Sequence, residues 1–479
     1  QLGSPLAGHP EYGHAPGIET TTGPLGQGFA NAVGMALAER HLNATNADID
    51  YHTYVMCGDG CLMEGISHEA ASFAGHMKLN KLIVLFDDNS ISIDGSTDLS
   101  TSDDNLVRFT SYGWEVKRID GHDPTAIHQA ISKAQRHDKP TLIACKTTIG
   151  FGSPNKAGTA KTHGSALGAD EVTATRENLG WHHPPFHIPD EVLAAWREIG
   201  TQNGKSKKAL LREADSFDSE LFLKLKKDIA QKAQATRQSS GDVLEAIAPH
   251  MPYLIGGSAD LTGSNNTKAS SQKTLTPENY GGNYIYYGVR EHGMAAIMNG
   301  LALSGLRPYG GTFLSFLDYC KPAVRLAALM GQPVIYVFTH DSIGLGEDGP
   351  THQPIEHLLS LRAIPHIQVL RPADAVETVE AWEIALKTTD KPTALILTRQ
   401  KVAALRTADS DENLSEKGAY IIHKSETPPK AIIIATGSEV EIAVEIANQH
   451  HEIRVVSMPS WELFEAQEEA YKKTILPDN

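Results

Sequence analysis

Residues 51–93 constrain the fold of this chain more than any other stretch. Residues 51–56 are apolar, β-branched and aromatic, which predicts a short strand that ends at Gly58-Asp59-Gly60. Residues 64–78 carry apolar side chains at helical spacing, and the apolar run 82–86 predicts a second, buried parallel strand. A strand, a helix and a parallel strand form one right-handed crossover. Asp59 and Asn89 are therefore expected at the carboxyl ends of two strands, the edge where open α/β sheets bind ligands.

Asp59 and Asn89 together predict a metal site. A carboxylate and an amide oxygen that face each other suit a hard cation such as Mg²⁺, which completes its octahedron with phosphate oxygens and water. Asp-Gly and Asp-Asn are also ordinary turn residues, so a single GDG indicates little. Its place at a strand end, one helix before Asn89, favours a metal–diphosphate site over a pair of loops. This arrangement resembles the thiamine-diphosphate motif, in which GDG and a downstream Asn hold the metal.

Composition is typical of a soluble protein with two or three domains. The chain has 479 residues, 41% hydrophobic and 21% charged, with no apolar run long enough to span a bilayer and no secretory signal at its start. Its four cysteines, Cys57, Cys61, Cys145 and Cys320, fit no zinc or CxxC pattern and favour free thiols in a reducing, cytoplasmic compartment. A formal net charge of −16 argues against nucleic acid or an anionic membrane as a partner.

The remaining pattern predicts an α/β fold with two doubly wound, mostly parallel sheets and an incomplete third α/β domain. We place these domains at 1–190, 236–410 and 411–479, with an exposed helical linker at 191–235. Further strands are expected at 114–119, 141–146, 253–259, 284–289, 334–339, 367–370, 393–397, 431–435 and 454–457. Further helices are expected at 29–41, 124–135, 293–303, 316–330, 373–387 and 439–448.

Two loops in the first domain are predicted to have a function. Residues 19–28 form a Gly-rich loop that enters a helix, where free backbone N–H groups can bind an anion, although a tight turn would also explain the glycines. Residues 149–167 form a long irregular loop with His163 near its end, which favours an active-site flap. His9, taken alone, is more typical of a surface histidine than of a catalytic one.

Glu291 lies where a predicted strand gives way to a helix. An acid in the first helical turn is stabilising for dipole reasons alone. In an apolar cleft its pKa would rise, and it could exchange a proton with a cofactor ring nitrogen. Phe313, Phe316 and Tyr319 fall on one helical face by their spacing, which is typical of a core but could also stack a flat heteroaromatic ring. The polar loop 339–354, with two histidines and several acids, favours an active-site loop.

Several segments, in order along nearly the whole chain, point to one family. They are ETTTGPLGQG, CGDGCLMEGISHE, DDNSISIDG, KTTIGFGSPNKAGTAKTHG, GGSADLTGSN, YGVREHGM, HDSIGLGEDGPTHQP and LTRQ. On these segments the chain resembles transketolase. The resemblance implies a diphosphate- and metal-binding domain at 1–190, a pyrimidine-binding domain at 236–410, and thiamine diphosphate with Mg²⁺ or Ca²⁺ as cofactors. It also leads us to expect family segments before Gln1 and after Asn479.

The resemblance implies a role for each matching residue. The metal ligands would be Asp59, Asn89 and the backbone carbonyl of Ile91. The cofactor pocket would be lined by Gly23, Leu25, Gly60, Glu64, Asn89, His163 and Asp260, with Glu291 protonating the aminopyrimidine N1′ and Phe313, Phe316 and Tyr319 clasping its ring. His9, His163 and His352 would move hydroxyl protons, and Asp348 would read the donor's C2 hydroxyl. The sugar phosphate would be bound by Arg237, Ser264, His340 and Arg399.

The implied reaction moves a two-carbon glycolaldehyde unit from a ketose phosphate, such as xylulose 5-phosphate, to an aldose phosphate, such as ribose 5-phosphate or erythrose 4-phosphate. It belongs to the non-oxidative pentose phosphate pathway. The family geometry implies a homodimer with shared sites, in which Glu69 would join a carboxylate pathway unless it is a solvated helix acid.

Two alternatives remain beside this interpretation. A related thiamine enzyme, such as a deoxyxylulose-phosphate synthase or a 2-oxo-acid dehydrogenase component, would share the metal motif and the glutamate. The loop with Asp348 and the phosphate-binding residues argue against it. A catalytically silent binding protein would typically have lost Glu291 or a metal ligand, and this chain retains both.

Overall fold

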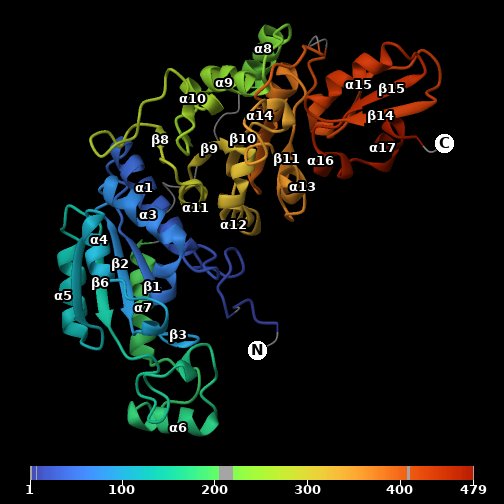
Figure 1. Cartoon of the computed structure of the whole chain (residues 1–479). Coiled ribbons are helices and arrows are strands. Elements are labelled where there is room, and N and C mark those ends of the chain that lie inside the picture. Colours follow the sequence, from blue (N-terminus) through green and yellow to red (C-terminus); the bar gives the residue numbers. More distant parts are fainter. Residues whose placement is uncertain (1–2, 7, 204–218, 407–409, 478–479) are drawn as a thin grey trace. The chain divides into compact units, whose positions relative to one another are not determined.

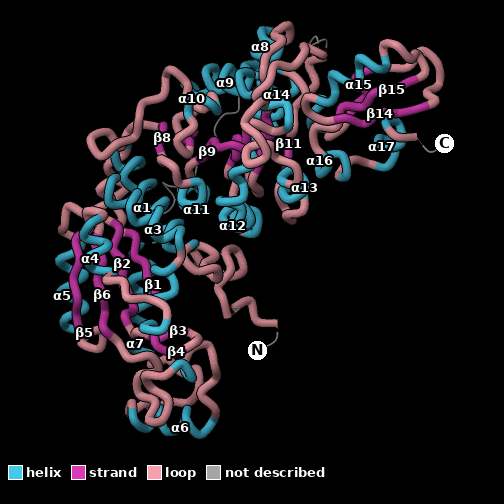
Figure 2. Tube along the Cα trace, in the orientation of Figure 1, coloured by secondary structure: helices cyan, strands magenta, loops and turns pink. Residues whose placement is uncertain are grey.

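The computed structural model describes residues 3–6, 8–203, 219–406 and 410–477 (Figure 1). The chain forms two compact units. We call Gly23–Glu39 with Asp48–Asp215 the N-terminal unit, and Gln1–Thr22, Arg40–Ala47 and Ser216–Asn479 the C-terminal unit. Within both units strands and helices alternate along the chain, as the colours of Figure 2 show. Among the described residues, no helix is long and apolar enough to cross a bilayer.

The N-terminal unit contains a four-stranded, all-parallel sheet in the order β1-β2-β6-β5. Its strands are β1 (Thr53–Gly58), β2 (Leu82–Asp88), β5 (Glu115–Asp120) and β6 (Thr141–Lys146). Its helices are α1 (Gln27–Thr45, which runs on into the other unit), α2 (Asp59–Met63), α3 (Gly65–His76), α4 (Asn105–Ser111), α5 (Pro124–Ala134), α6 (Ala169–Asn178) and α7 (Asp190–Asn203). A short hairpin, β3 (Ile91–Ser92) with β4 (Gly95–Ser96), follows β2. The four predicted strands are confirmed.

The register of β1 and β2 places the predicted metal ligands. Gly58 pairs with Asp87, so both strands end at the same level. Asp59 begins α2 directly after β1, and Asn89 follows β2 by one residue. The predicted helix between the two parallel strands is α3, and the short helix α2 that precedes it was not predicted.

The C-terminal unit contains a six-stranded, all-parallel sheet in the order β11-β12-β10-β9-β7-β8. Its strands are β7 (Leu254–Ser258), β8 (Tyr284–Tyr286), β9 (Arg307–Phe313), β10 (Ile335–Thr339), β11 (Gln368–Leu370) and β12 (Thr393–Leu397). Its helices include α8 (Ser219–Ile229), α9 (Thr236–Ile247), α10 (Thr262–Asn265), α11 (Glu291–Leu303), α12 (Leu317–Leu329), α13 (His357–Arg362) and α14 (Ala375–Lys387). Trp382 of α14 is fully buried in the core on one side of this sheet, and its Nε1 donates to Ser240 Oγ at 2.8 Å.

Strand β9 was missed in the sequence, although it lies inside the sheet. Pro308, Gly310 and Gly311 are typical of turns and weaken a strand pattern. The structure explains the glycines by close packing: a Cβ on Gly310 would lie 2.6 Å from Met298 Sδ of α11. Glycine is required here because α11 packs against the strand, and the alternation pattern of a strand does not reveal such packing.

A third, smaller sheet follows in the order β13-β15-β14. It consists of β13 (Tyr420–His423), β14 (Ala431–Ala435) and β15 (Ile453–Ser457), with α15 (Glu439–Ala447), α16 (Trp461–Glu465) and α17 (Glu469–Ile475). β14 and β15 are parallel, whereas β13 is antiparallel to β15. The predicted third α/β element is therefore present.

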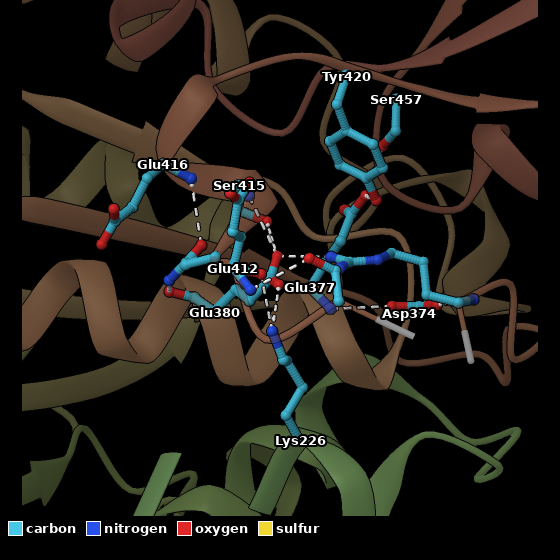
Figure 3. A network of polar contacts seen from close by, with 12 residues as sticks. Lys226, Asp374, Glu377, Glu380, Glu412, Ser415, Glu416, Tyr420 and Ser457 are labelled. Carbon is cyan, nitrogen blue, oxygen red and sulfur yellow. Dashed lines mark hydrogen bonds and ion pairs between the residues drawn. The ribbon is translucent and has the colours of Figure 1, made fainter. Parts of the chain in front are cut away.

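The interpretation of residues 191–235 as an exposed helical linker is wrong for α8, while residues 204–218 lie outside the described residues. Phe222, Lys226 and Ile229 of α8 are buried. Lys226 Nζ lies 3.2 Å from Glu380 Oε1 of α14, and the two side chains are 4% and 0% exposed (Figure 3). The helical spacing was interpreted correctly, but a charged residue that is buried against a partner looks like a surface residue in the sequence.

Candidate active site

The strand ends of the N-terminal unit open into a cavity of about 540 Å³. Its wall is formed by the ends of β1 and β2, the β3 hairpin, the loop before α1 and the loop after β6. The lining residues are Leu25, Gly58, Asp59, Gly60, Cys61, Asp87, Asn89, Ile91, Ser92, Ile93, Asp94, Ile149, Thr162, His163 and Gly164. The cavity therefore brings together segments of sequence that lie far apart around one acidic edge.

Asp59 and Asn89 are joined through the turn that follows β2. Asp59 Oδ2 accepts the N–H of Ser90 at 3.2 Å, and Asn89 Oδ1 accepts the N–H of Ile91 at 2.9 Å. Asn89 Nδ2 donates to Asp87 Oδ2 at 3.0 Å. Burial and then the charge of Asp88 raise the pKa of Asp59. A bound cation would offset both effects, so the electrostatics of this carboxylate favour a cation at the edge.

The Gly-rich loop before α1 packs tightly against the same edge. Gly26 has a φ of +79°, and a Cβ there would lie 2.6 Å from Ile66 Cγ2 of α3. A Cβ on Gly60 would lie 3.0 Å from Leu25 Cδ1, and both of these residues line the cavity. Glycine at positions 26 and 60 thus leaves room for the side chains of Ile66 and Leu25 to pack against the backbone.

The cavity includes several but not all of the predicted residues of this unit. Leu25, Asp59, Gly60, Asn89, Ile91 and His163 line it. Gly23 and Glu64 do not, although Gly23 lies in the loop before α1 and exposed Glu64 lies between α2 and α3. Asp87, Cys61 and Thr162 line it without having been predicted. Asp87 stands two residues before Asn89, so its place at the strand end could have been recognised.

Glu291 is the first residue of α11 in the C-terminal unit. Its side chain is buried, with 7% exposed, and burial raises the pKa of its carboxyl group. The N-terminus of a helix favours a negative charge, but here the effect of burial is larger. A buried carboxyl group whose pKa is raised is suited to exchange a proton with a ligand nitrogen.

The proposed aromatic wall is present, but its predicted basis in one helix is wrong. Phe313 ends β9, Phe316 lies in a 3₁₀ turn (Leu314–Phe316), and Tyr319 lies in α12. The rings of Phe313 and Phe316 are stacked with centroids 5.5 Å apart, and the Phe316 and Tyr319 centroids are 5.9 Å apart. The spacing was interpreted as one helix because the strand β9 was missed.

Histidines and arginines of the C-terminal unit gather at this wall. The ring centroid of His340 lies 3.8 Å from that of Phe313, and His352 meets Phe316 edge-on at 5.4 Å. Burial and the charges of Arg237 and Arg399 lower the pKa of His340 to about 4. At neutral pH His340 is therefore uncharged beside two guanidinium groups, which is a favourable setting for an anion.

The other predicted residues of this unit lie as follows. Arg237 donates to the backbone carbonyl of Ser264, and burial and Arg399 lower the Arg237 pKa. Asp260 and Asp348 are exposed, and Asp260 has a φ of +61° after β7. His9 is exposed in the N-terminal segment. By contrast, Asp341 is buried and accepts from Arg371 Nε at 2.9 Å, so this acid of the 339–354 loop is structural.

Three family descriptions match the chain. "Transketolase, thiamine diphosphate binding domain" matches residues 1–241, "Transketolase, pyrimidine binding domain" matches 232–404, and "Transketolase-like TK C-terminal domain" matches 418–479. A curated transketolase of Sinorhizobium medicae is 52% identical over 505 residues, covering 100% of this chain and 73% of the relative. The chain belongs to the transketolase family. Its thiamine diphosphate binding domain contains the cavity described above.

Other transketolases agree with this assignment. The enzyme of Cereibacter sphaeroides is 51% identical, over 99% of this chain and 76% of the relative. The solved transketolase of Leishmania mexicana has a TM-score of 0.92 and 42% identity, and it covers 100% of this chain and 75% of that chain. A Pichia stipitis transketolase, solved as a complex with sedoheptulose 7-phosphate, has a TM-score of 0.90 and 44% identity, over 100% and 76% of the two chains. The predicted family, fold class and enzyme class are confirmed.

Proposed function

We propose that the chain transfers a glycolaldehyde unit from a ketose phosphate, such as xylulose 5-phosphate, to an aldose phosphate, such as ribose 5-phosphate or erythrose 4-phosphate. The observation that carries the proposal is the cavity at the ends of β1 and β2, where Asp59, Asn89 and Ile91 come together. The reaction belongs to the non-oxidative pentose phosphate pathway. Structures of related transketolases with sugar phosphates support this substrate class.

A divalent metal is the finer part of the cofactor proposal. The side-chain oxygens of Asp59 and Asn89 and the carbonyl of Ile91 would hold Mg²⁺ or Ca²⁺, since hard cations prefer oxygen ligands. Among the described residues, no group of three or more His, Cys, Asp or Glu side chains could hold a metal by itself. A site with so few acidic ligands fits a metal that takes its other oxygens from a diphosphate. Thiamine diphosphate, when bound, supplies an electron sink for the two-carbon unit.

The chain's own side chains would bind and protonate this cofactor. Leu25, Gly60 and His163 line the cavity, and we assign Gly23, Glu64 and Asp260 to the same pocket by family resemblance. Glu291 would hold a proton at the aminopyrimidine N1′, a role that its raised pKa supports. Phe313, Phe316 and Tyr319 would stack on the ring.

The cationic group of the C-terminal unit would bind the sugar phosphate. Arg237 and Arg399 lie close enough to lower the pKa of His340, and a phosphate dianion would offset this repulsion. Ser264 would add a hydrogen bond, and Asp348 would select the donor's C2 hydroxyl. His9, His163 and His352 would move hydroxyl protons of the sugars, which suits imidazole near neutral pH.

The proposal also covers the oligomeric state of the protein and its location in the cell. We propose a homodimer with shared active sites, in which Glu69 of α3 contributes to a carboxylate pathway, and a cytoplasmic location, which the four free thiols support. The predicted domain boundaries at 190, 235 and 410 likewise stay a prediction.

To test the proposal, the apo protein is titrated with thiamine diphosphate and Mg²⁺, and binding is followed by circular dichroism and calorimetry. Xylulose 5-phosphate and ribose 5-phosphate are then added to the same sample. We expect saturable, metal-dependent binding and formation of sedoheptulose 7-phosphate. Glu291→Ala should lower turnover by about 10²–10⁴-fold while the fold is retained. A correctly folded dimer that binds no cofactor would overturn the proposal, and binding without turnover would contradict the activity.

A further inference from the structure

The loop between β6 and α6 supplies part of the lining of the cavity. We call residues 147–168 the flap (Figure 1). Ile149, Thr162, His163 and Gly164 of the flap line the cavity. The flap contains no strand and only one short 3₁₀ turn, Ala160–Thr162. Hydrogen bonds within the flap and side chains outside it both hold this irregular segment in shape.

His122 holds the first limb of the flap. It lies in the turn between β5 and α5, where its Nε2 accepts the backbone N–H of Thr148 at 2.9 Å. Its ring also stacks on Phe151, with centroids 4.0 Å apart and planes 23° apart. A nitrogen that accepts an N–H must carry its lone pair, so this contact requires an unprotonated Nε2.

Glu171 of α6 holds the middle of the flap. Its Oε1 accepts the hydroxyl of Ser153 in a short hydrogen bond and the N–H of Asn155 at 2.9 Å. Its Oε2 accepts Asn155 Nδ2, also at 2.9 Å. These hydrogen bonds lower the pKa of Glu171 to about 2. Both oxygens of the Glu171 carboxylate thus accept hydrogen bonds from residues of the flap.

Contacts inside the flap connect the residues that His122 and Glu171 restrain with the residues that line the cavity. Ile149 O accepts the N–H of Gly158 at 2.8 Å, which joins the two limbs. A Cβ on Gly150 would lie 2.5 Å from Thr162 Cγ2, so the limb that His122 restrains lies directly against the residue before His163. This contact links the limb that contains Thr148 to the segment that contains Thr162 and His163.

We propose that His122 and Glu171 are positioning residues that hold the flap in the shape that places Ile149, Thr162 and His163 at the cavity. The consequence for catalysis rests on the proposed function, because it takes the cavity as the cofactor site. Loss of either restraint should weaken cofactor binding and lower kcat by about 10- to 100-fold, since supporting contacts of a site have effects of this size.

Matched variants separate the hydrogen bond from the ring stack. His122→Phe keeps a ring against Phe151 but removes the acceptor, whereas His122→Gln keeps an acceptor and removes the ring. His122→Phe and Glu171→Ala should weaken thiamine diphosphate binding about tenfold or more, and His122→Gln should restore most of the affinity. His128, an exposed residue of the adjoining helix α5, provides the control His128→Phe, which should bind like wild type.

A second readout needs no cofactor. Lys156 and Lys161 lie within the flap, so limited trypsin digestion of the apo protein, with mass spectrometry of the fragments, reports how well the flap is held. We expect faster cleavage at these two lysines in His122→Phe and Glu171→Ala, with little change in Tm. Wild-type cleavage rates and cofactor affinities in both variants would overturn the proposal. If the wild-type protein itself binds no cofactor, the proposed function fails, while the digestion still tests whether His122 and Glu171 hold the flap.

Discussion

Acidic side chains occur in two contrasting settings in this molecule. At the cavity edge of the N-terminal unit, Asp59 is half-buried and accepts one backbone N–H, and its pKa is raised. In α14 of the C-terminal unit, Glu380 is fully buried, but Lys226, Arg406 and the backbone and hydroxyl of Ser415 all donate to it (Figure 3). The carboxylate of Asp59 thus has few hydrogen-bond donors around it, whereas that of Glu380 has a full set.

The difference separates binding from structure. A buried carboxylate whose donors all come from the chain stabilises the fold and leaves nothing for a ligand. A carboxylate that is partly desolvated and lies beside other acids costs stability until a cation arrives. We therefore interpret the cavity edge as a cation-binding site. We interpret the network of Glu380 with Lys226, Arg406 and Ser415 as a purely structural one.

The largest expected effect on stability is in the network around Glu380. Glu380→Ala would leave Lys226 and Arg406 buried without their shared partner, at a cost of about 3–5 kcal/mol. The Tm of the apo protein should fall by roughly 10 °C. A fall of only one or two degrees would show that water or other acids replace Glu380, and the contrast with Asp59 would be lost.

Asp59→Asn should act in the opposite way. The change removes a charge that burial and Asp88 oppose, so the Tm of the apo protein should stay unchanged or rise slightly. Metal-dependent binding of thiamine diphosphate should weaken by at least about 100-fold, because loss of a ligand exceeds loss of a supporting contact. Calorimetric titration with and without Mg²⁺ measures this directly, and binding at wild-type affinity would remove Asp59 from the site.

A smaller effect depends on pH. Burial and then the charge of Asp374 raise the pKa of Glu377 in α14 from 4.5 to about 7, although Tyr420 and Ser457 donate to its Oε1 at 2.6 and 2.5 Å. The folded chain holds this proton more tightly than the unfolded chain, so this group's contribution to stability falls as pH rises from about 4.5 to about 7. Across this range the free energy of unfolding should decline by at most roughly 3 kcal/mol, and the measured Tm should fall with it, less steeply in Glu377→Gln. An equal decline in both proteins would assign the effect to other groups.

The smallest effect comes from the residue next to Lys226. Lys227 pairs with Asp411 at 3.1 Å, but the two side chains are 54% and 72% exposed. Lys227→Ala should change stability by less than about 1 kcal/mol, because water screens an exposed pair. Lys226→Ala serves as the matched comparison and should have a clearly larger effect in the same urea titration. Equal effects would mean that burial does not decide the strength of these pairs.

The parts of the site that could be predicted are those encoded locally. The strands around Asp59 and Asn89 have strong apolar patterns with abrupt polar ends, and parallel strands must end at a common edge. Gly60 and Leu25 were assigned to the pocket through the resemblance to transketolase. Strand β9 could not be predicted because its glycines are required by tertiary packing, Gly310 against Met298 of α11 and Gly311 against Thr267. The mistaken single helix for Phe313, Phe316 and Tyr319 followed from that omission.

The sequence by itself determined the α/β class, the family and the acidic strand ends, because periodicity, strand-breaking residues and short motifs are properties of neighbours along the chain. Only the tertiary structure decided that Lys226 is buried, that His340 is uncharged beside Arg237 and Arg399, and that His122 and Glu171 hold the flap. These properties arise from residues that are distant in sequence. Burial and charge act through space, so a pattern of neighbours cannot record them.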